Sequence, residues 1–207
     1  MCIFAAMNDN IVWTENVVLV DADYADSVAF NLIVNFERII GRRIPQADMA
    51  RWLDCVALDG GVREGEHDTS VLLLHDKDRQ ALNNFVPSHY ERELNGKAFK
   101  DHLGEFMLMA LPVEQFTTKS DFMVEALLMA CSRQEVKRVM VVADECHYPQ
   151  VSGALRRLDH DSPEQLDGKR ITVFTMEPRE GGCFRQEILG FSLMSALGIR
   201  GDEIHAS

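Results

Sequence analysis

Five short apolar runs alternate along this sequence with segments whose apolar residues recur at helical spacing. Within each run the apolar residues are consecutive instead of alternating with polar ones, which is typical of strands covered by helices on both faces. The runs occupy residues 17–20, 71–74, 106–110, 139–142 and 171–174. Strands that alternate with helices in this way predict a doubly wound α/β domain with a five-stranded parallel sheet.

The segments between the runs predict six helices. Gly41, just past one segment, and Pro45, at the start of the next, are typical of helix ends. The helices are expected at residues 26–40, 45–55, 79–85, 120–133, 149–158 and 184–197. We expect residues 1–16 to be an N-terminal extension and residues 17–207, which contain no repeat or shift in composition, to form one domain with the C-terminal helix. The polar segment 88–104 receives no assignment.

Charge and hydropathy limit the compartment and the partners. The formal net charge is −12 and the pI is near 5.0, and an acidic surface repels nucleic acid at long range. No apolar run reaches the roughly 18 residues needed to cross a bilayer, and the N-terminus lacks the basic flank of a signal peptide. Five scattered cysteines without a Cys-x-x-Cys motif fit reduced thiols. We therefore expect a cytoplasmic protein without a membrane segment.

Acidic residues follow every predicted strand. In a doubly wound sheet ligands bind outside the carboxyl ends of the strands, so these residues are the first candidates for a site. They are Asp21, Asp23, Asp76, Asp78, Asp121, Asp144, Glu145 and Glu177. Basic pairs such as Arg42-Arg43 and Lys169-Arg170 fall at the amino ends, where they complement helix C-termini. An edge of this kind predicts binding of a divalent metal, although Ser120 or Asp121 could equally cap a helix.

Three motifs, taken in order, resemble the NYN branch of the PIN-like nucleases. A strand ending in Val-Asp-x-(Asp/Glu) is similar to Val20-Asp21-Ala22-Asp23, and a Lys-x-x-Asp-type helix start is similar to Lys119-Ser120-Asp121, with one residue fewer. The motif Ser-Gly-Asp-Ser-Asp-Phe-x-Pro-x-Val is similar to residues 142–151, which keep Asp144, the proline and the final valine. The whole chain also resembles an uncharacterised bacterial family of unknown function, which implies no activity.

The PIN/NYN resemblance implies a strand order and a metal site. With the five strands numbered along the chain, the order is 3-2-1-4-5, which brings Asp21 and Asp144 together at the switch point and Asp121 in from a helix start. Three carboxylates at one point repel each other unless a cation or protons intervene. Oxygen ligands suit Mg²⁺ or Mn²⁺, which activates water for cleavage of single-stranded RNA. Asp23 or Glu145 would assist as supporting residues.

Departures from the motif leave a second hypothesis open. Cys146 replaces the second aspartate of the strand-four motif and His147 replaces its aromatic neighbour. No basic and aromatic surface for single-stranded RNA is visible beside the acids. The chain is therefore either a divalent-metal-dependent endoribonuclease or a catalytically silent relative used for binding or assembly.

A third hypothesis comes from Asp21-Ala22-Asp23 alone, which also resembles the haloacid-dehalogenase phosphatases. That resemblance implies Asp21 as nucleophile and Asp23 as acid/base. The family pattern has Thr or Val where this chain has Ala25, and Ser or Thr where it has His75. The match is poorer than the PIN/NYN match.

The C-terminal helical segment predicts a homodimer. Phe184, Ile188, Phe191 and Leu197 fall near one stripe that can face the sheet, whereas Leu189, Leu193 and Met194 lie beside or beyond it. An apolar patch left exposed usually marks an interface, so we expect a twofold homodimer through this helix. The alternative is that segment 88–104 or the N-terminal extension covers it.

Overall fold

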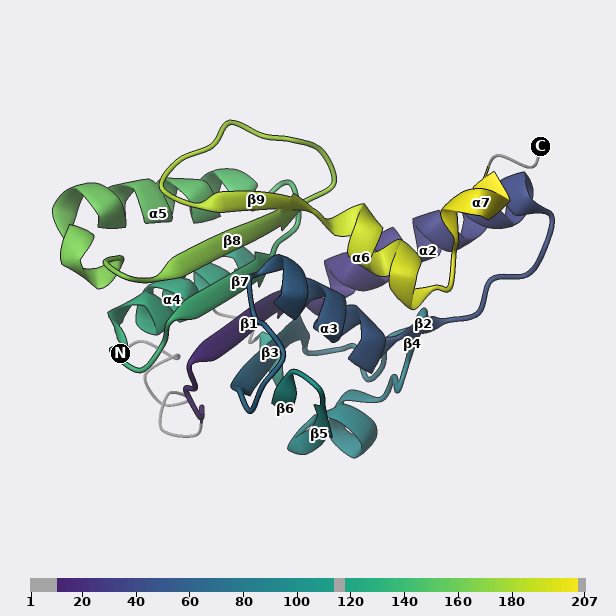
Figure 1. Ribbon diagram of the computed structural model, residues 1–207, viewed down its shortest axis with the longest axis horizontal. Helices are drawn as coiled ribbons and strands as arrows, with labels where there is room; N and C mark the ends of the chain where they lie inside the picture. Colours follow the sequence, from purple (N-terminus) through teal and green to yellow (C-terminus); the bar gives the residue numbers. More distant parts are fainter. Residues whose placement is uncertain (1–10, 114–117, 205–207) are drawn as a thin grey trace.

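The computed structural model describes residues 11–113 and 118–204, which form an α/β fold around one large sheet (Figure 1). Seven strands pair in the order β5-β6-β3-β1-β7-β8-β9. All neighbours are parallel except β5 and β6. The strands are β1 (Asn16–Asp21), β3 (Asp68–Asp76), β5 (Lys97–Asp101), β6 (Gly104–Val113), β7 (Arg138–Val142), β8 (Arg170–Thr175) and β9 (Arg185–Ile188).

Helices cover both faces of this sheet, as the consecutive apolar residues of the strands require. One face packs against α2 (Ala22–Ile40), α3 (Met49–Asp59) and α6 (Leu189–Ala196). The other packs against α4 (Lys119–Ser132) and α5 (Tyr148–Asp161). Successive residues of β1 alternate between the two cores, with Val18 and Val20 in the first and Val17 and Leu19 in the second. Because both sides are apolar, every residue of β1 is buried.

The smaller elements complete the chain. A two-stranded parallel sheet joins β2 (Ala47–Asp48) to β4 (Phe85–Val86). A π-helix, η2 (Tyr90–Leu94), and a 3₁₀-helix, η3 (Pro163–Gln165), precede β5 and β8 respectively. The short α7 (Gly201–Ile204) lies beside α2 (Figure 1). None of the helices in the described ranges is long and apolar enough to span a bilayer.

The predicted strand order is confirmed, but the predicted number of strands is wrong. The five expected strands correspond to β1, β3, β6, β7 and β8, and they pair as 3-2-1-4-5. The sheet has two more strands, β5 and β9, one at each edge. Most of the residues in these two strands are exposed or only partly buried. They therefore lack the consecutive apolar residues by which the inner strands were recognised.

Three predicted helices differ from the structure. Residues 79–85 form a loop and the start of β4, not a helix. The helix expected from Pro45 begins at Met49, with Asp48 as its N-cap, because the Asp48 side chain accepts from the Arg51 N–H. The predicted C-terminal helix 184–197 is divided into β9 and the shorter α6. Segment 88–104 contains η2 and β5.

The buried face of α6 agrees only in part with the predicted one. Leu197 is fully buried as predicted, but so are Leu189 and Leu193, whereas Phe191 is 70% exposed. The reason is the contact of α6 with α3, where Trp52 Nε1 donates to Ser192 Oγ at 3.2 Å. This buried hydrogen bond fixes the rotation of α6 and turns Phe191 outward.

We predict that Leu193→Ala lowers the free energy of unfolding by about 2–5 kcal/mol, since it leaves a cavity between α6 and α3. Urea denaturation followed by circular dichroism measures the change. Val12→Ala, at an exposed position, is the control and should change the stability by less than about 0.5 kcal/mol. Equal effects of the two substitutions would contradict this packing.

Candidate functional site

Carboxylates gather at the carboxyl ends of β1, β3 and β7, and we call Asp21, Asp23, Asp76, Asp144 and Glu145 the acidic edge. Asp21 ends β1 and is the N-cap of α2, because its Oδ1 accepts from the Tyr24 N–H at 3.1 Å. The residue is only 2% exposed. Burial raises the pKa of Asp21 above its ordinary value, against the opposing effect of the Lys119 charge. A buried carboxylate of this kind needs a cation nearby.

Lys119, the first residue of α4, supplies that cation. Its Nζ lies 2.6 Å from Asp23 Oδ2, 3.1 Å from Asp76 Oδ1 and 3.3 Å from Asp21 Oδ1. The lysine side chain is 13% exposed. Burial acts to lower the pKa of Lys119, but the surrounding carboxylates outweigh it and hold the pKa well above its ordinary value. The ammonium is therefore a permanent positive charge at the centre of the acidic edge.

A second cation, Arg79, extends the network toward the loop after β3. Its Nε lies 3.4 Å from Asp23 Oδ1 and its Nη1 lies 3.7 Å from Asp26 Oδ2. Asp26 is buried and its Oδ1 accepts from the backbone N–H groups of Asn83 and Asn84, at 3.0 and 2.7 Å. These bonds hold residues 83–84 in a bend where a helix was predicted. The role of Asp26 was missed because it lies inside α2, away from any strand end.

The end of β7 brings a third set of contacts. Asp144 Oδ1 accepts from the Cys146 N–H at 2.8 Å. Partial burial acts to raise the pKa of Asp144, but the hydrogen bonds from Cys146 outweigh it and lower the pKa. Glu145 pairs with Arg179 at 2.6 Å, and His147 Nδ1 lies 3.7 Å from Asp21 Oδ2. Arg179 comes from the segment between β8 and β9, so sequence spacing gave no sign of this pair.

Asp121 serves the helix on which it lies. The Asp121 N–H donates to Thr118 Oγ1 at 3.0 Å, and Thr118 Oγ1 is 2.7 Å from Asp121 Oδ2, to which it donates. Thr118 is thus the N-cap of α4, and Asp121 is its partner in the first turn. These contacts match the alternative that this segment caps a helix. The capping residue is Thr118, whereas Ser120 or Asp121 was considered for that role.

Two stacked aromatic rings lie next to the acidic edge, one of them on the residue that precedes Asp76. His75 and Tyr90 stack with centroids 3.8 Å apart and an interplanar angle of 6°. Burial lowers the pKa of His75, and its Nδ1 lies 3.0 Å from the Asp76 carbonyl oxygen. A neutral ring that donates from Nδ1 fits this contact. The position where the phosphatase pattern has Ser or Thr is therefore a buried packing residue.

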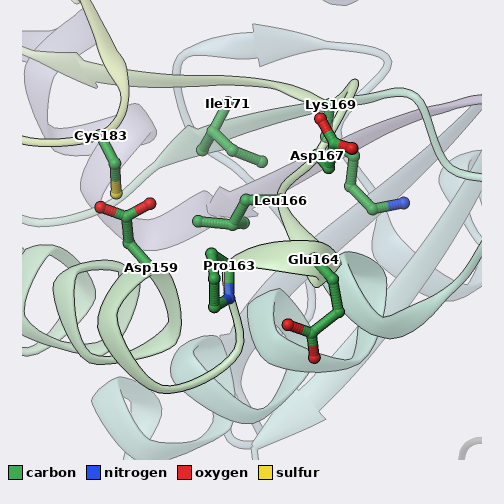
Figure 2. A pocket seen from close by; sticks show the side chains of 8 residues that line it. All are labelled: Asp159, Pro163, Glu164, Leu166, Asp167, Lys169, Ile171 and Cys183. Carbon is green, nitrogen blue, oxygen red and sulfur yellow. The ribbon is translucent and has the colours of Figure 1, made fainter.

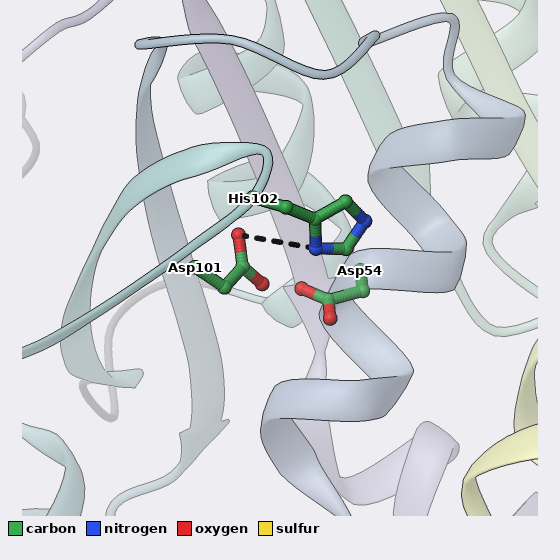
Figure 3. Close-up of side chains that lie close together, drawn as sticks. All are labelled: Asp54, Asp101 and His102. Atoms are coloured by element: carbon green, nitrogen blue, oxygen red, sulfur yellow. Dashed lines mark ion pairs between the residues drawn. The ribbon is translucent and has the colours of Figure 1, made fainter.

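The distances between potential metal ligands are short in a group of residues that lies outside the acidic edge. In residues 11–113 and 118–204, one set of three His, Cys, Asp or Glu side chains has its ligand atoms all within 4.8 Å of one another: Asp54, Asp101 and His102 (Figure 3). Asp21, Asp121 and Asp144 are not such a set. Their assignment as metal ligands, with Asp23 and Glu145 in support, stays a prediction.

The cavity drawn in Figure 2 lies away from the acidic edge, beside α5, η3 and the start of β8. It measures about 450 Å³ and includes Asp159, Glu164 and Asp167. Its one cation, Lys169, donates to the Arg133 and Val136 carbonyl oxygens. The predicted role of this basic pair at a helix C-terminus is confirmed for Lys169, and its ammonium is already bound by the chain itself.

Comparison with known proteins identifies a family without an assigned activity. The family of unknown function DUF6621 matches residues 10–204. The chain belongs to this family. No curated protein and no solved structure matches it. The predicted likeness to an uncharacterised family agrees with this membership, and the PIN/NYN resemblance stays a hypothesis.

We predict that Lys119→Met destabilises this DUF6621 member by roughly 3–5 kcal/mol, because it removes the ammonium beside buried Asp21 and leaves Asp23 with Arg79 alone. The pKa of Asp21 is already raised, and loss of the lysine raises it further. A raised carboxyl pKa favours the folded state only while the group is protonated, so the loss should be smaller at pH 5 than at pH 8. Urea denaturation at both pH values tests this, with Lys77→Met as the control. A loss that is the same at both pH values would contradict it.

Proposed function

We propose that this protein is a catalytically silent binding and assembly module, whose acidic edge is neutralised by its own side chains. The observation that carries the proposal is the position of Lys119, whose ammonium contacts three carboxylates at 2.6–3.3 Å. A divalent ion at this edge would have to displace that ammonium. Mg²⁺ in particular demands near-octahedral oxygen ligands and dehydrates reluctantly, which makes the exchange unfavourable.

The remaining contacts of the acidic edge support the same proposal. Glu145 has Arg179, and Asp144 has the Cys146 N–H. Asp121 binds Thr118 within its own helix. Each carboxylate therefore already has an internal partner, and such networks stabilise a fold as readily as they prepare a site.

A metal-dependent ribonuclease is the second candidate, favoured by the adjacency of β1 and β7 in the sheet. Asp21, Asp121 and Asp144 would then hold Mg²⁺ or Mn²⁺, and the ion would activate water to cleave single-stranded RNA. Lys119 would first have to leave the carboxylates, and the net charge of −12 opposes RNA binding. Because of these two costs, the ribonuclease has less support than the catalytically silent module.

The phosphatase alternative has the least support. It requires Asp23 to deliver a proton to a leaving group. Asp23 Oδ2 accepts from Lys119 and from the Asp76 N–H at 2.8 Å, and Arg79 lies 3.4 Å from Oδ1. Oδ2 is therefore occupied by two donors, and Oδ1 is buried beside a cation, which favours the deprotonated carboxylate over a proton donor.

For assembly we propose a second copy of the chain as the partner, bound through α6. Phe191 projects from this helix with 70% of its surface exposed. Beside it lies a cavity of about 560 Å³ whose lining includes Met194, Ile199 and Ile204. One surface thus carries both a projecting aromatic ring and an apolar hollow, which is the self-complementarity that a twofold interface needs. In such a dimer each Phe191 would enter the hollow of the other copy.

We predict that the wild-type protein gains no thermal stability from 10 mM Mg²⁺ and does not cleave single-stranded RNA in its presence. Lys119→Met should gain stability from Mg²⁺, because its carboxylates lack a cation. A dissociation constant ten times below the Mg²⁺ concentration would correspond to about 1.4 kcal/mol. Differential scanning fluorimetry and a fluorescent RNA assay measure the two effects. Wild-type cleavage that depends on Mg²⁺ and is lost in Asp144→Asn would establish the ribonuclease instead.

We predict that Phe191→Glu converts a dimer into a monomer at micromolar concentration, since it places a charge in the apolar contact. Light scattering after size-exclusion chromatography measures the mass. Val12→Glu, also at an exposed apolar position, is the matched control and should remain dimeric. A monomeric wild-type protein would exclude this interface. Leu193 is unsuitable as a probe, because it is fully buried.

A further inference from the structure

Two carboxylates and an imidazole converge between α3 and the β5–β6 turn (Figure 3). Asp54 lies on α3, Asp101 ends β5, and His102 begins the turn between β5 and β6. One potential ligand atom from each residue lies within 4.8 Å of the other two. This turn is at the amino end of β6, so the group is separate from the acidic edge.

Within residues 11–113 and 118–204, the carboxylate of Asp54 forms no ion pair with a lysine or an arginine. Its Oδ1 is buried and lacks a hydrogen-bond partner among the described residues. The charged groups that act on Asp54 are Asp101 and Asp48, both of the same sign. A hydrogen bond between Asp54 and Asp101 requires one of them to carry a proton. This is the opposite of the acidic edge, where Lys119 lies between the carboxylates.

Backbone contacts fix the turn in this geometry. The Leu103 N–H donates to Asp101 Oδ1 at 2.7 Å, and the Leu103 side chain is fully buried. Gly104 has φ +117°, and a Cβ there would meet the His67 carbonyl oxygen at 2.0 Å. Gly65 N–H also donates to the His102 carbonyl oxygen at 3.0 Å. These contacts fix the backbone of the turn and the position of the Asp101 carboxylate without the help of an ion.

We propose that Asp54, Asp101 and His102 bind one transition-metal dication of the Zn²⁺ type. Two facing carboxylates attract a cation, and the His102 ring, whose Nδ1 lies 4.0 Å from Asp101 Oδ1, balances their charge only when it is protonated. The imidazole selects against Mg²⁺ and Ca²⁺, which prefer oxygen ligands, and in favour of Zn²⁺. Three protein donors leave a fourth position of a tetrahedral ion for water. The exposed side of His102, whose side chain is 54% accessible, gives the ion a route to the group.

Isothermal titration of Zn²⁺ into chelator-treated full-length protein at pH 7.5 tests the proposal. We expect one ion per chain at this site. Both Asp54→Asn and His102→Ala should weaken binding at least tenfold, while His160→Ala should leave it unchanged. His160 is a matched control, because it also pairs with a neighbouring aspartate, Asp161, but is 87% exposed and belongs to no such group of three in the described part of the chain.

Two results would overturn the proposal. One is absence of Zn²⁺ binding to the wild-type protein, which would leave a shared proton as the link between the two carboxyl groups. The other is equal Zn²⁺ affinity in wild-type and His102→Ala proteins. Unfolding in the presence of a chelator checks that His102→Ala is folded, and its exposed side chain predicts a stability close to that of the wild type.

Discussion

The contact of one ammonium with three carboxylates governs the carboxyl end of this sheet. Lys119 opens α4, and its partners end β1, begin α2 and end β3. Burial alone would drive Asp21 toward its protonated form, and the lysine charge opposes this. The interaction therefore ties a helix on one face of the sheet to two central strands and to a helix on the other face. It also places an ammonium beside Asp21, one of the three carboxylates predicted to bind a metal ion.

The two groups of acids differ in whether lysine or arginine side chains lie among them, and this difference affects their ability to bind a metal ion. At the acidic edge, Lys119, Arg79 and Arg179 lie among the carboxylates. Between α3 and the β5–β6 turn, Asp54 faces Asp101 with His102 as the third group. An internal cation makes an acid cluster part of the fold, whereas an uncompensated pair has a reason to bind an ion from solution. Abundance of acids in the sequence does not distinguish these cases.

Membership of DUF6621 leaves the activity open, so the argument rests on geometry. The sheet order places β1 beside β7, as the PIN/NYN resemblance implies. Strand order is shared by proteins with unrelated functions, and function belongs to the site. The proposal of a silent module therefore rests on the contacts of Lys119 and on Cys146, which stands where the NYN motif has an aspartate.

The inner strands could be read from the sequence because burial on both faces imposes consecutive apolar residues. The same rule could not reveal β5 or β9, since edge strands contact the sheet on one side and keep polar residues. Residues 79–85 were wrongly predicted as a helix because their spacing is helical. The decisive bonds come from Asp26, more than fifty residues earlier in the chain.

Sequence alone determined the α/β class and the presence of acids at the carboxyl ends of the strands, and the order of the central strands was implied by the PIN/NYN resemblance. Only the tertiary structure decided which cation each acid meets. Lys119 is far from Asp21 and Asp23 in sequence, and Arg179 reaches Glu145 from the segment before β9. Tertiary packing likewise set the rotation of α6 through Trp52 and Ser192, and it placed Asp54 opposite Asp101 and His102. Side-chain pairing across distant segments depends on how helices dock on the sheet, and local periodicity does not record that docking.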